Sequence, residues 1–142
     1  MTNSWMIFAL GSAFFAGLTA LFGKMGVENV NSNMATFLRT IIIMLVSAAI
    51  ITLNSEWQRI DRLSSRTLIF LALSGIATGF SWLCYYRALQ LGHIAQVASV
   101  DKFSVVFAII LAALFLGEAL TWQTILGALL IVSGSIVIAW PR

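Results

Sequence analysis

The segment ASVDKFSVVFAIILAALFLGE, residues 98–118, is the stretch that decides the fold. It places an acid and a base side by side, Asp101 and Lys102, at the head of an apolar run that reaches Leu116 without another charge. A run of this length is typical of a helix that crosses the hydrocarbon core of a bilayer. Ionisable side chains are costly to keep on such a helix, so this pair is the first functional candidate.

Composition extends the membrane interpretation to the whole chain. Of its 142 residues, 61% are hydrophobic and only 9% are charged, and the mean hydropathy is +1.00. A soluble domain carries about 25% charged residues, so we predict an all-α integral membrane protein surrounded by lipid. The eight Lys and Arg residues are scattered, which argues against a nucleic-acid partner. One cysteine, Cys84, and one histidine, His93, provide no disulfide, no metal-ligand set and no sign of a cofactor.

Five apolar segments are long enough to be transmembrane helices. They are residues 4–23, 33–53, 67–86 (with a continuation to 91 left open), 95–116 and 121–140. The first is expected to be retained, because no Lys or Arg precedes it and it exceeds the ~7–15 apolar residues of a cleaved signal. Short polar loops join the segments, so neighbouring helices are expected to pack antiparallel within one domain, residues 1–142.

Arg39 and Asp101 are predicted to lie at matching depths in the membrane. Each lies about six residues into its span, and both spans start on the same membrane face, so both residues are about 9 Å deep. They could form a structural ion pair or contribute to a substrate site, and the sequence leaves both alternatives open. Lys102 points about 100° away around its helix, and it lacks an obvious acidic partner if Asp101 pairs with Arg39.

Aromatic residues and a further arginine complete the candidate site. Trp82 and Tyr85 could line a pocket or belong to an interfacial aromatic belt, whereas the belt is the better explanation for Tyr86. Arg87 could extend to the lipid headgroups or face a substrate. The net positive sign of the embedded charges favours an anionic or zwitterionic ligand. The candidates for substrate or ion binding are Arg39, Trp82, Tyr85, Arg87, Asp101 and Lys102.

Small residues indicate where helices approach each other closely, because lipid provides no hydrophobic drive for helix association. Gly75 and Gly79 form a GxxxG pattern in the third span, and Gly127 and Gly134 lie one heptad apart in the fifth. These four glycines are the candidates for helix packing or dimer formation, and packing without any further function would be enough to explain them.

The distribution of basic residues leaves the orientation in the membrane open. With five spans, the loop that holds Arg59, Arg62 and Arg66 lies on one side, and Lys24 and Arg142 lie on the other. This bias is too weak for the positive-inside rule to decide. Either the chain has one unresolved topology or its molecules insert in both orientations.

Three segments carry a resemblance to a known family. They are FGKMGVENVNSNMATFLRT (residues 22–40), SGIATGFSWLCYYRALQLG (74–92) and VDKFSVVFAIILAALFLGEALTWQTILGALLIVSG (100–134). Together they resemble the EamA-type half of the drug/metabolite transporter superfamily, and its five-span, single-repeat bacterial and archaeal members in particular. The chain would then be one half-repeat of a ten-helix transporter fold. The resemblance implies a secondary transporter or exporter of small metabolites in the bacterial inner membrane, working as a homodimer whose subunits are antiparallel.

The resemblance is incomplete in two places. The fifth span is also similar to the dimerising last helix of small multidrug resistance proteins, but those proteins depend on a glutamate in their first helix, and this chain has no acid there. Export of cationic drugs by that mechanism is therefore not expected. EamA relatives often have a proline just before the Asp-Lys pair, where this chain has Ser99. A helix break at this point is consequently not required.

Three function classes follow. The first is alternating-access transport of a small, amino-acid-like or anionic solute by a homodimer, with Asp101 as the proton-coupling residue. Arg39 and Lys102 would bind the substrate or keep Asp101 ionised. The second is a non-transporting membrane subunit that stabilises a partner. An enzyme is the least favoured class, because the chain offers no nucleophile–base pair or metal set.

Overall fold

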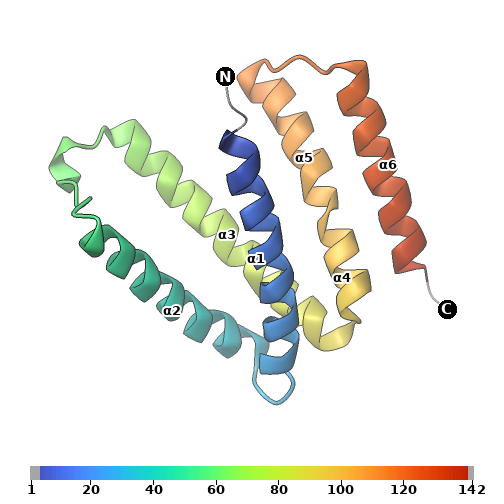
Figure 1. The fold of residues 1–142 in the computed structure, drawn as a ribbon, viewed down its shortest axis with the longest axis horizontal. Coiled ribbons are helices and arrows are strands. Elements are labelled where there is room, and N and C mark those ends of the chain that lie inside the picture. Colours follow the sequence, from blue (N-terminus) through green and yellow to red (C-terminus); the bar gives the residue numbers. More distant parts are fainter. Residues whose placement is uncertain (1–3, 141–142) are drawn as a thin grey trace. The chain divides into compact units, whose positions relative to one another are not determined.

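The computed structural model describes residues 4–140, and every regular element in that range is helical (Figure 1). The elements are α1 (Ser4–Gly26), α2 (Ser32–Leu53), η1 (Ile60–Arg62), α3 (Ser65–Leu91), α4 (Ile94–Asp101), α5 (Phe103–Leu111), η2 (Ala112–Leu116) and α6 (Trp122–Ala139). Five helices are long and apolar enough to cross a membrane, with α4, α5 and η2 forming one of them, Ile94–Leu116. The predicted all-α, five-span fold is confirmed.

The surface of the described helices suits lipid rather than water. Large apolar side chains are exposed along the spans, for example Phe8 at 78%, Phe70 at 60% and Phe115 at 80%. Because hydrocarbon chains solvate such side chains as well as a protein core does, their exposure costs nothing in a bilayer. The chain is a multi-pass membrane protein.

The chain divides into two compact units. We call Gly23–Gln90 the α2–α3 unit, and Met1–Phe22 with Leu91–Arg142 the α4–α6 unit. The single domain that we expected over residues 1–142 stays a prediction. Arg142, which entered the topology argument, lies outside the described residues.

In the α2–α3 unit, the loop before α2 is tied to the end of α3. The side chain of Asn31 caps α2 by accepting hydrogen bonds from the backbone of Asn33 at 2.9 Å and of Met34 at 3.4 Å. Gln90 at the end of α3 donates to the carbonyl oxygens of Val27 at 2.9 Å and Val30 at 2.6 Å. These bonds explain why α3 continues to Leu91, beyond the shorter predicted end, since its polar last turn is satisfied within the protein.

A second set of contacts joins the end of α1 to the same turn. Lys24 donates a hydrogen bond to the carbonyl oxygen of Leu89, one of the α3 carbonyls left without a helical partner. A Cβ atom added at Gly23 would lie 3.3 Å from Leu89 and 3.4 Å from the Tyr86 hydroxyl. A Cβ at position 23 would require the Leu89 and Tyr86 side chains to shift by a few tenths of an ångström, so glycine lets the end of α1 approach α3 without that adjustment.

In the α4–α6 unit, the fourth span is interrupted at Lys102, although no proline is present. The backbone N–H of Lys102 bonds to Ser99 O at 3.1 Å, and that of Val105 bonds to Lys102 O at 3.1 Å, both with the spacing of a tight turn. The Ser99 hydroxyl donates to Gln96 O at 2.9 Å. Hydrogen bonds from a serine hydroxyl to a nearby backbone carbonyl compete with the hydrogen bonds of the helix and bend it. The Ser99 bond therefore accounts for a break without proline.

The two halves of this broken span pack against α6, and α4 makes the larger contact. Buried serines mark both helices, with Ser99 exposed at 8% and Ser135 at 5%. Gln96 also donates to the carbonyl oxygen of Ala139 at 3.5 Å. Small and polar residues at this contact agree with the rules of helix packing in lipid.

Candidate functional site

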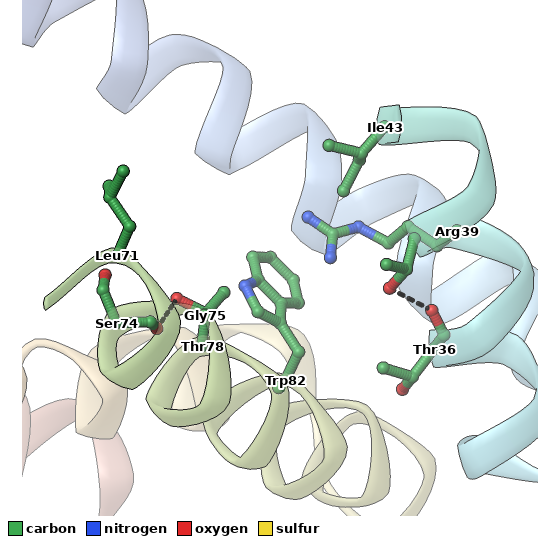
Figure 2. A pocket seen from close by; sticks show the side chains of 10 residues that line it. Thr36, Arg39, Ile43, Leu71, Ser74, Gly75, Thr78 and Trp82 are labelled. Carbon is green, nitrogen blue, oxygen red and sulfur yellow. Dashed lines mark hydrogen bonds between the residues drawn. The ribbon is translucent and has the colours of Figure 1, made fainter. Parts of the chain in front are cut away.

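A cleft of about 410 Å³ lies between α2 and α3. Four residues of α2 and six of α3 line it, and Figure 2 shows how those that it labels face the cleft. They are Thr36, Arg39, Thr40, Ile43, Leu71, Ser74, Gly75, Thr78, Gly79 and Trp82. The cleft is large enough for a small organic molecule. It brings together two predicted site residues, Arg39 and Trp82, and the GxxxG pair.

Arg39 reaches from α2 to the Trp82 indole of α3 (Figure 2). Its guanidinium carbon lies 3.3 Å from the centroid of the Trp82 ring and 5.7 Å from that of Tyr86. A guanidinium over an aromatic face is stabilised by up to about 2 kcal/mol where water is excluded. Among the described residues of its own unit, no acid forms an ion pair with Arg39. The α2–α3 unit therefore holds this cation by aromatic contact.

The aromatic residues of α3 form a cluster beneath this cation. The Trp82 ring meets Tyr85 edge to face with centroids 5.4 Å apart, and it meets Tyr86 at 5.8 Å. Tyr86 is only 5% exposed and lies against the Gly23 position. The interpretation of Tyr86 as an interfacial belt residue was wrong, because the close approach of α1 to α3 buries it.

Hydroxyl groups supply the other polar atoms of the cleft. Thr36 donates to Ser32 O at 2.9 Å, Thr40 to Thr36 O at 2.8 Å, and Thr78 to Ser74 O at 2.8 Å. Each hydroxyl proton is used within its helix, whereas the oxygen keeps lone pairs that can accept. The cleft therefore combines one cationic donor with several neutral acceptors.

Gly75 and Gly79 border this cleft, and neither makes a close contact with another helix within residues 4–140. A Cβ atom added at either position would meet nothing within 4 Å. The same holds for Gly127 and Gly134 of α6. Their assignment to contacts between chains stays a prediction.

Arg87 is not among the residues that line the cleft. It donates to the Gln90 side chain at 3.0 Å and so supports the residue that ties α3 to the loop before α2. The geometry of the α2–α3 unit gives Arg87 a structural contact, and a role in binding stays a prediction.

Asp101 and Lys102 lie at the break in the fourth span. The Lys102 ammonium is 3.8 Å from the Asp101 carboxylate, with the two side chains 55% and 42% exposed, respectively. Lys102 thus lies beside an acid. The predicted Arg39–Asp101 pair would have left Lys102 without an acidic partner. Arg39 belongs to the other unit, so that pairing stays a prediction. No group of three or more His, Cys, Asp or Glu residues suited to a metal occurs within residues 4–140.

Sequence reasoning missed the hydroxyl lining on α2. The signal was available, because Thr36, Arg39, Thr40 and Ile43 follow the i, i+3, i+4, i+7 spacing of one helix face. A polar face centred on an intramembrane arginine is typical of a helix that lines a cavity. The buried position of Tyr86 had no such signal, since it depends on Gly23, which is distant in sequence.

Comparison with known proteins agrees with this architecture. The model of the EamA-like transporter family matches residues 3–140. An uncharacterised transporter encoded in the cobO 3′ region of a Sinorhizobium species is 49% identical over 98% of this chain and 99% of its own length. Human solute carrier family 35 member G1 is 31% identical over 90% of this chain but 34% of its own length. A probable terminal-alkyne amino-acid exporter of Streptantibioticus cattleyicolor is 38% identical over 56% of this chain and 27% of its own length.

No solved structure matches the chain significantly. The family match covers all five membrane-length helices, and the Sinorhizobium relative is aligned almost from end to end. The chain is a member of the EamA-like transporter family and a membrane transporter.

Proposed function

We propose that this protein is a secondary transporter that moves a small organic solute across the bacterial inner membrane as a homodimer, by alternating access. The observation that carries the proposal is Arg39, a cation held over Trp82 at the edge of a cleft between two membrane-length helices. An arginine at the centre of a transmembrane helix costs about 2.5–3.5 kcal/mol on the mildest scales, and Arg39, in the first half of α2, carries part of this cost. A contact with a solute in the cleft explains why this cost is tolerated.

The solute that fits this cleft is amino-acid-like or anionic. Arg39 provides the positive charge, while the hydroxyl oxygens of Thr36, Thr40 and Thr78 can accept from an ammonium or hydroxyl group. The Streptantibioticus relative, which is named as an exporter of an amino acid, supports this class. The family points to transport rather than to an enzymatic reaction.

Asp101 is the residue we assign to proton coupling. Its carboxylate lies beside Lys102 at the break in the fourth span, where a change of charge would act directly on the ion pair. An intramembrane carboxylate that can take up a proton is the usual element of a proton relay. Lys102 either binds the solute or keeps Asp101 ionised.

The homodimer is proposed because the chain matches almost the whole length of the Sinorhizobium transporter with only five membrane-length helices. Many transporters place their site between two inverted halves, and this chain supplies one five-helix half. Gly127 and Gly134 leave open space on α6 into which a helix of a second copy could pack. The weak charge bias of the loops is compatible with two copies in opposite orientations.

Transport in proteoliposomes tests the proposal. We expect purified protein to exchange labelled leucine or another small amino acid for unlabelled solute inside the vesicles, with accumulation driven by a proton gradient. Asp101→Asn should lose the response to the gradient and retain exchange, because the neutral amide cannot carry the proton. Ser104→Ala in the same span serves as the matched control.

The outcomes separate the function classes. Absence of exchange across a panel of amino acids and organic anions would contradict the transport proposal. Co-purification with one stoichiometric membrane partner, together with no flux, would support the non-transporting subunit instead. Unchanged gradient response in Asp101→Asn would remove Asp101 from the coupling step alone.

A further inference from the structure

The geometry of Arg39 and Trp82 restricts what the guanidinium can bind. At 3.3 Å from the ring centroid, the guanidinium carbon is at van der Waals distance, and two flat groups come this close only when stacked face to face. All N–H bonds of a guanidinium lie in its plane. Stacking therefore leaves the donors at the edge of the plane, while one face is covered by the indole.

We propose that the α2–α3 cleft binds the carboxylate group of its solute edge-on to Arg39, and that Trp82 is the positioning residue that holds the guanidinium in the required plane. This inference rests on the proposed transport function and names the chemical group that the site recognises. A carboxylate is planar and accepts two parallel N–H bonds from one guanidinium edge. Tyr86, which is buried, packs beside the indole with its ring centroid 5.8 Å from that of Trp82.

The rest of the cleft accommodates the body of such a solute. Gly75 and Gly79 line it, and a Cβ at either position would face open space, with no atom of another described helix within 4 Å. Leu71 and Ile43 add apolar surface to the same cleft. A carboxylate on Arg39 with a short apolar chain extending over the two glycines matches this distribution.

A phosphate group is the alternative anion, and it could come from a lipid headgroup as well as from a solute. It is tetrahedral, so it matches a fixed planar edge less fully than a carboxylate does. Comparison of isosteric probes distinguishes the two. The probes are 4-methylpentanoate, its uncharged amide 4-methylpentanamide, and 3-methylbutylphosphonate.

Fluorescence of Trp82 reports binding directly. In a protein whose other tryptophans (Trp5, Trp57, Trp122 and Trp140) are changed to phenylalanine, placed in phosphatidylcholine nanodiscs, we expect 4-methylpentanoate to change the emission saturably. The amide should give no response, and Arg39→Gln should weaken carboxylate binding about 10–100-fold, the range for a charge-assisted pair. An equal response to the amide, or no response to the carboxylate, overturns the proposal. Equal affinity for the phosphonate assigns the site to phosphate chemistry and overturns it as well.

The positioning role of Trp82 has its own readout. In calorimetric titrations of the complete protein, Trp82→Leu should raise the dissociation constant for 4-methylpentanoate about tenfold, and Trp82→Phe should recover part of this loss, since a smaller aromatic face still stacks. In proteoliposome exchange assays, both variants should show a higher KM for the transported solute and an unchanged maximal rate. Trp122→Leu is the control and should change neither quantity. A fall in maximal rate at constant KM would show a structural role only.

The two proposals can fail separately. Carboxylate binding without flux would contradict transport and leave the Arg39 site standing. Flux without preference for the carboxylate over its amide would contradict the Arg39 site and leave transport standing.

Discussion

Gly117 shows how a single residue ends the fourth span. Its φ angle of 68° lies in the left-handed region, which glycine adopts without steric cost. The N–H groups of Gly117 and Glu118 both bond to the carbonyl oxygen of Ala112, the latter at 3.4 Å. The Gly-Glu pair at the end of the quoted segment is therefore a helix cap.

We predict that Gly117→Ala destabilises the protein by about 1 kcal/mol, because a Cβ clashes with the backbone in the left-handed region. The change should lower the thermal midpoint in detergent by about 3 °C. Gly17→Ala is the matched control, since Gly17 lies within α1, has no positive φ and would place its Cβ in open space. A midpoint equal to that of the control would show that the cap contributes nothing.

At the scale of elements, the end of α3 is held by side chains rather than by apolar packing. Lys24 and Gln90 together satisfy the carbonyl oxygens of Leu89, Val27 and Val30. Lipid provides no hydrophobic driving force for helix association, so such hydrogen bonds supply part of the stability that a hydrophobic core gives a soluble protein. They hold the C-terminal end of α3 beside the loop that precedes α2, and so position the two helices that line the α2–α3 cleft.

Gln90→Glu tests this arrangement. A carboxylate cannot donate to Val27 and Val30, so two hydrogen bonds are lost and a charge faces two carbonyl oxygens. We expect a loss of about 2 kcal/mol in thermal unfolding, with faster hydrogen exchange in residues 27–31. Gln123→Glu on the exposed start of α6 should leave both unchanged. If residues 27–31 remain protected from hydrogen exchange in Gln90→Glu, the hydrogen bonds of Gln90 do not hold this loop to α3.

For the whole molecule, the main question is how one half-repeat makes a complete transporter. The chain aligns with nearly all of the Sinorhizobium transporter and with about a third of the human solute carrier. We propose that a second copy of the chain supplies the other five helices. The open glycine positions of α6 mark the helix that we expect at the dimer contact.

Topology reporters test the antiparallel dimer. Fusions at the C-terminus should give signals on both sides of the membrane, because antiparallel partners place their ends on opposite faces. A signal on one side only would exclude the antiparallel arrangement.

Substitution on α6 tests the dimer contact itself. Gly127→Leu and Gly134→Leu should each reduce cross-linked dimer with little loss of monomer stability, since a Cβ at either position faces open space among residues 4–140. Gly17→Leu on α1 is the control. Undiminished cross-linking in both α6 variants would move the contact to another helix.

Local sequence was sufficient for the number and approximate positions of the spans, although α1 and α3 extend beyond their predicted ends. It was also sufficient for the choice of candidates. Membrane-length apolar runs can be recognised without knowing which helices pack together. A charged residue within such a run is rare and therefore easy to select as a candidate. Arg39 and Trp82 were thus found before their contact was known. Tyr86 was misassigned because its burial depends on a contact with the distant Gly23. The threonine lining was missed although its helical spacing around Arg39 is visible in the sequence.

The sequence by itself determined that lipid surrounds the chain, and it determined the five helices, the charges within them and the family. Each of these depends on hydropathy or residue order along the chain. Only the tertiary structure decided that Arg39 stacks on Trp82, that Gly75 and Gly79 border a cleft, and that Tyr86 is buried. The physical reason is that lipid and protein interior are both apolar. In a membrane helix, hydrophobic periodicity no longer shows which face points inward, so contacts with distant segments must decide it.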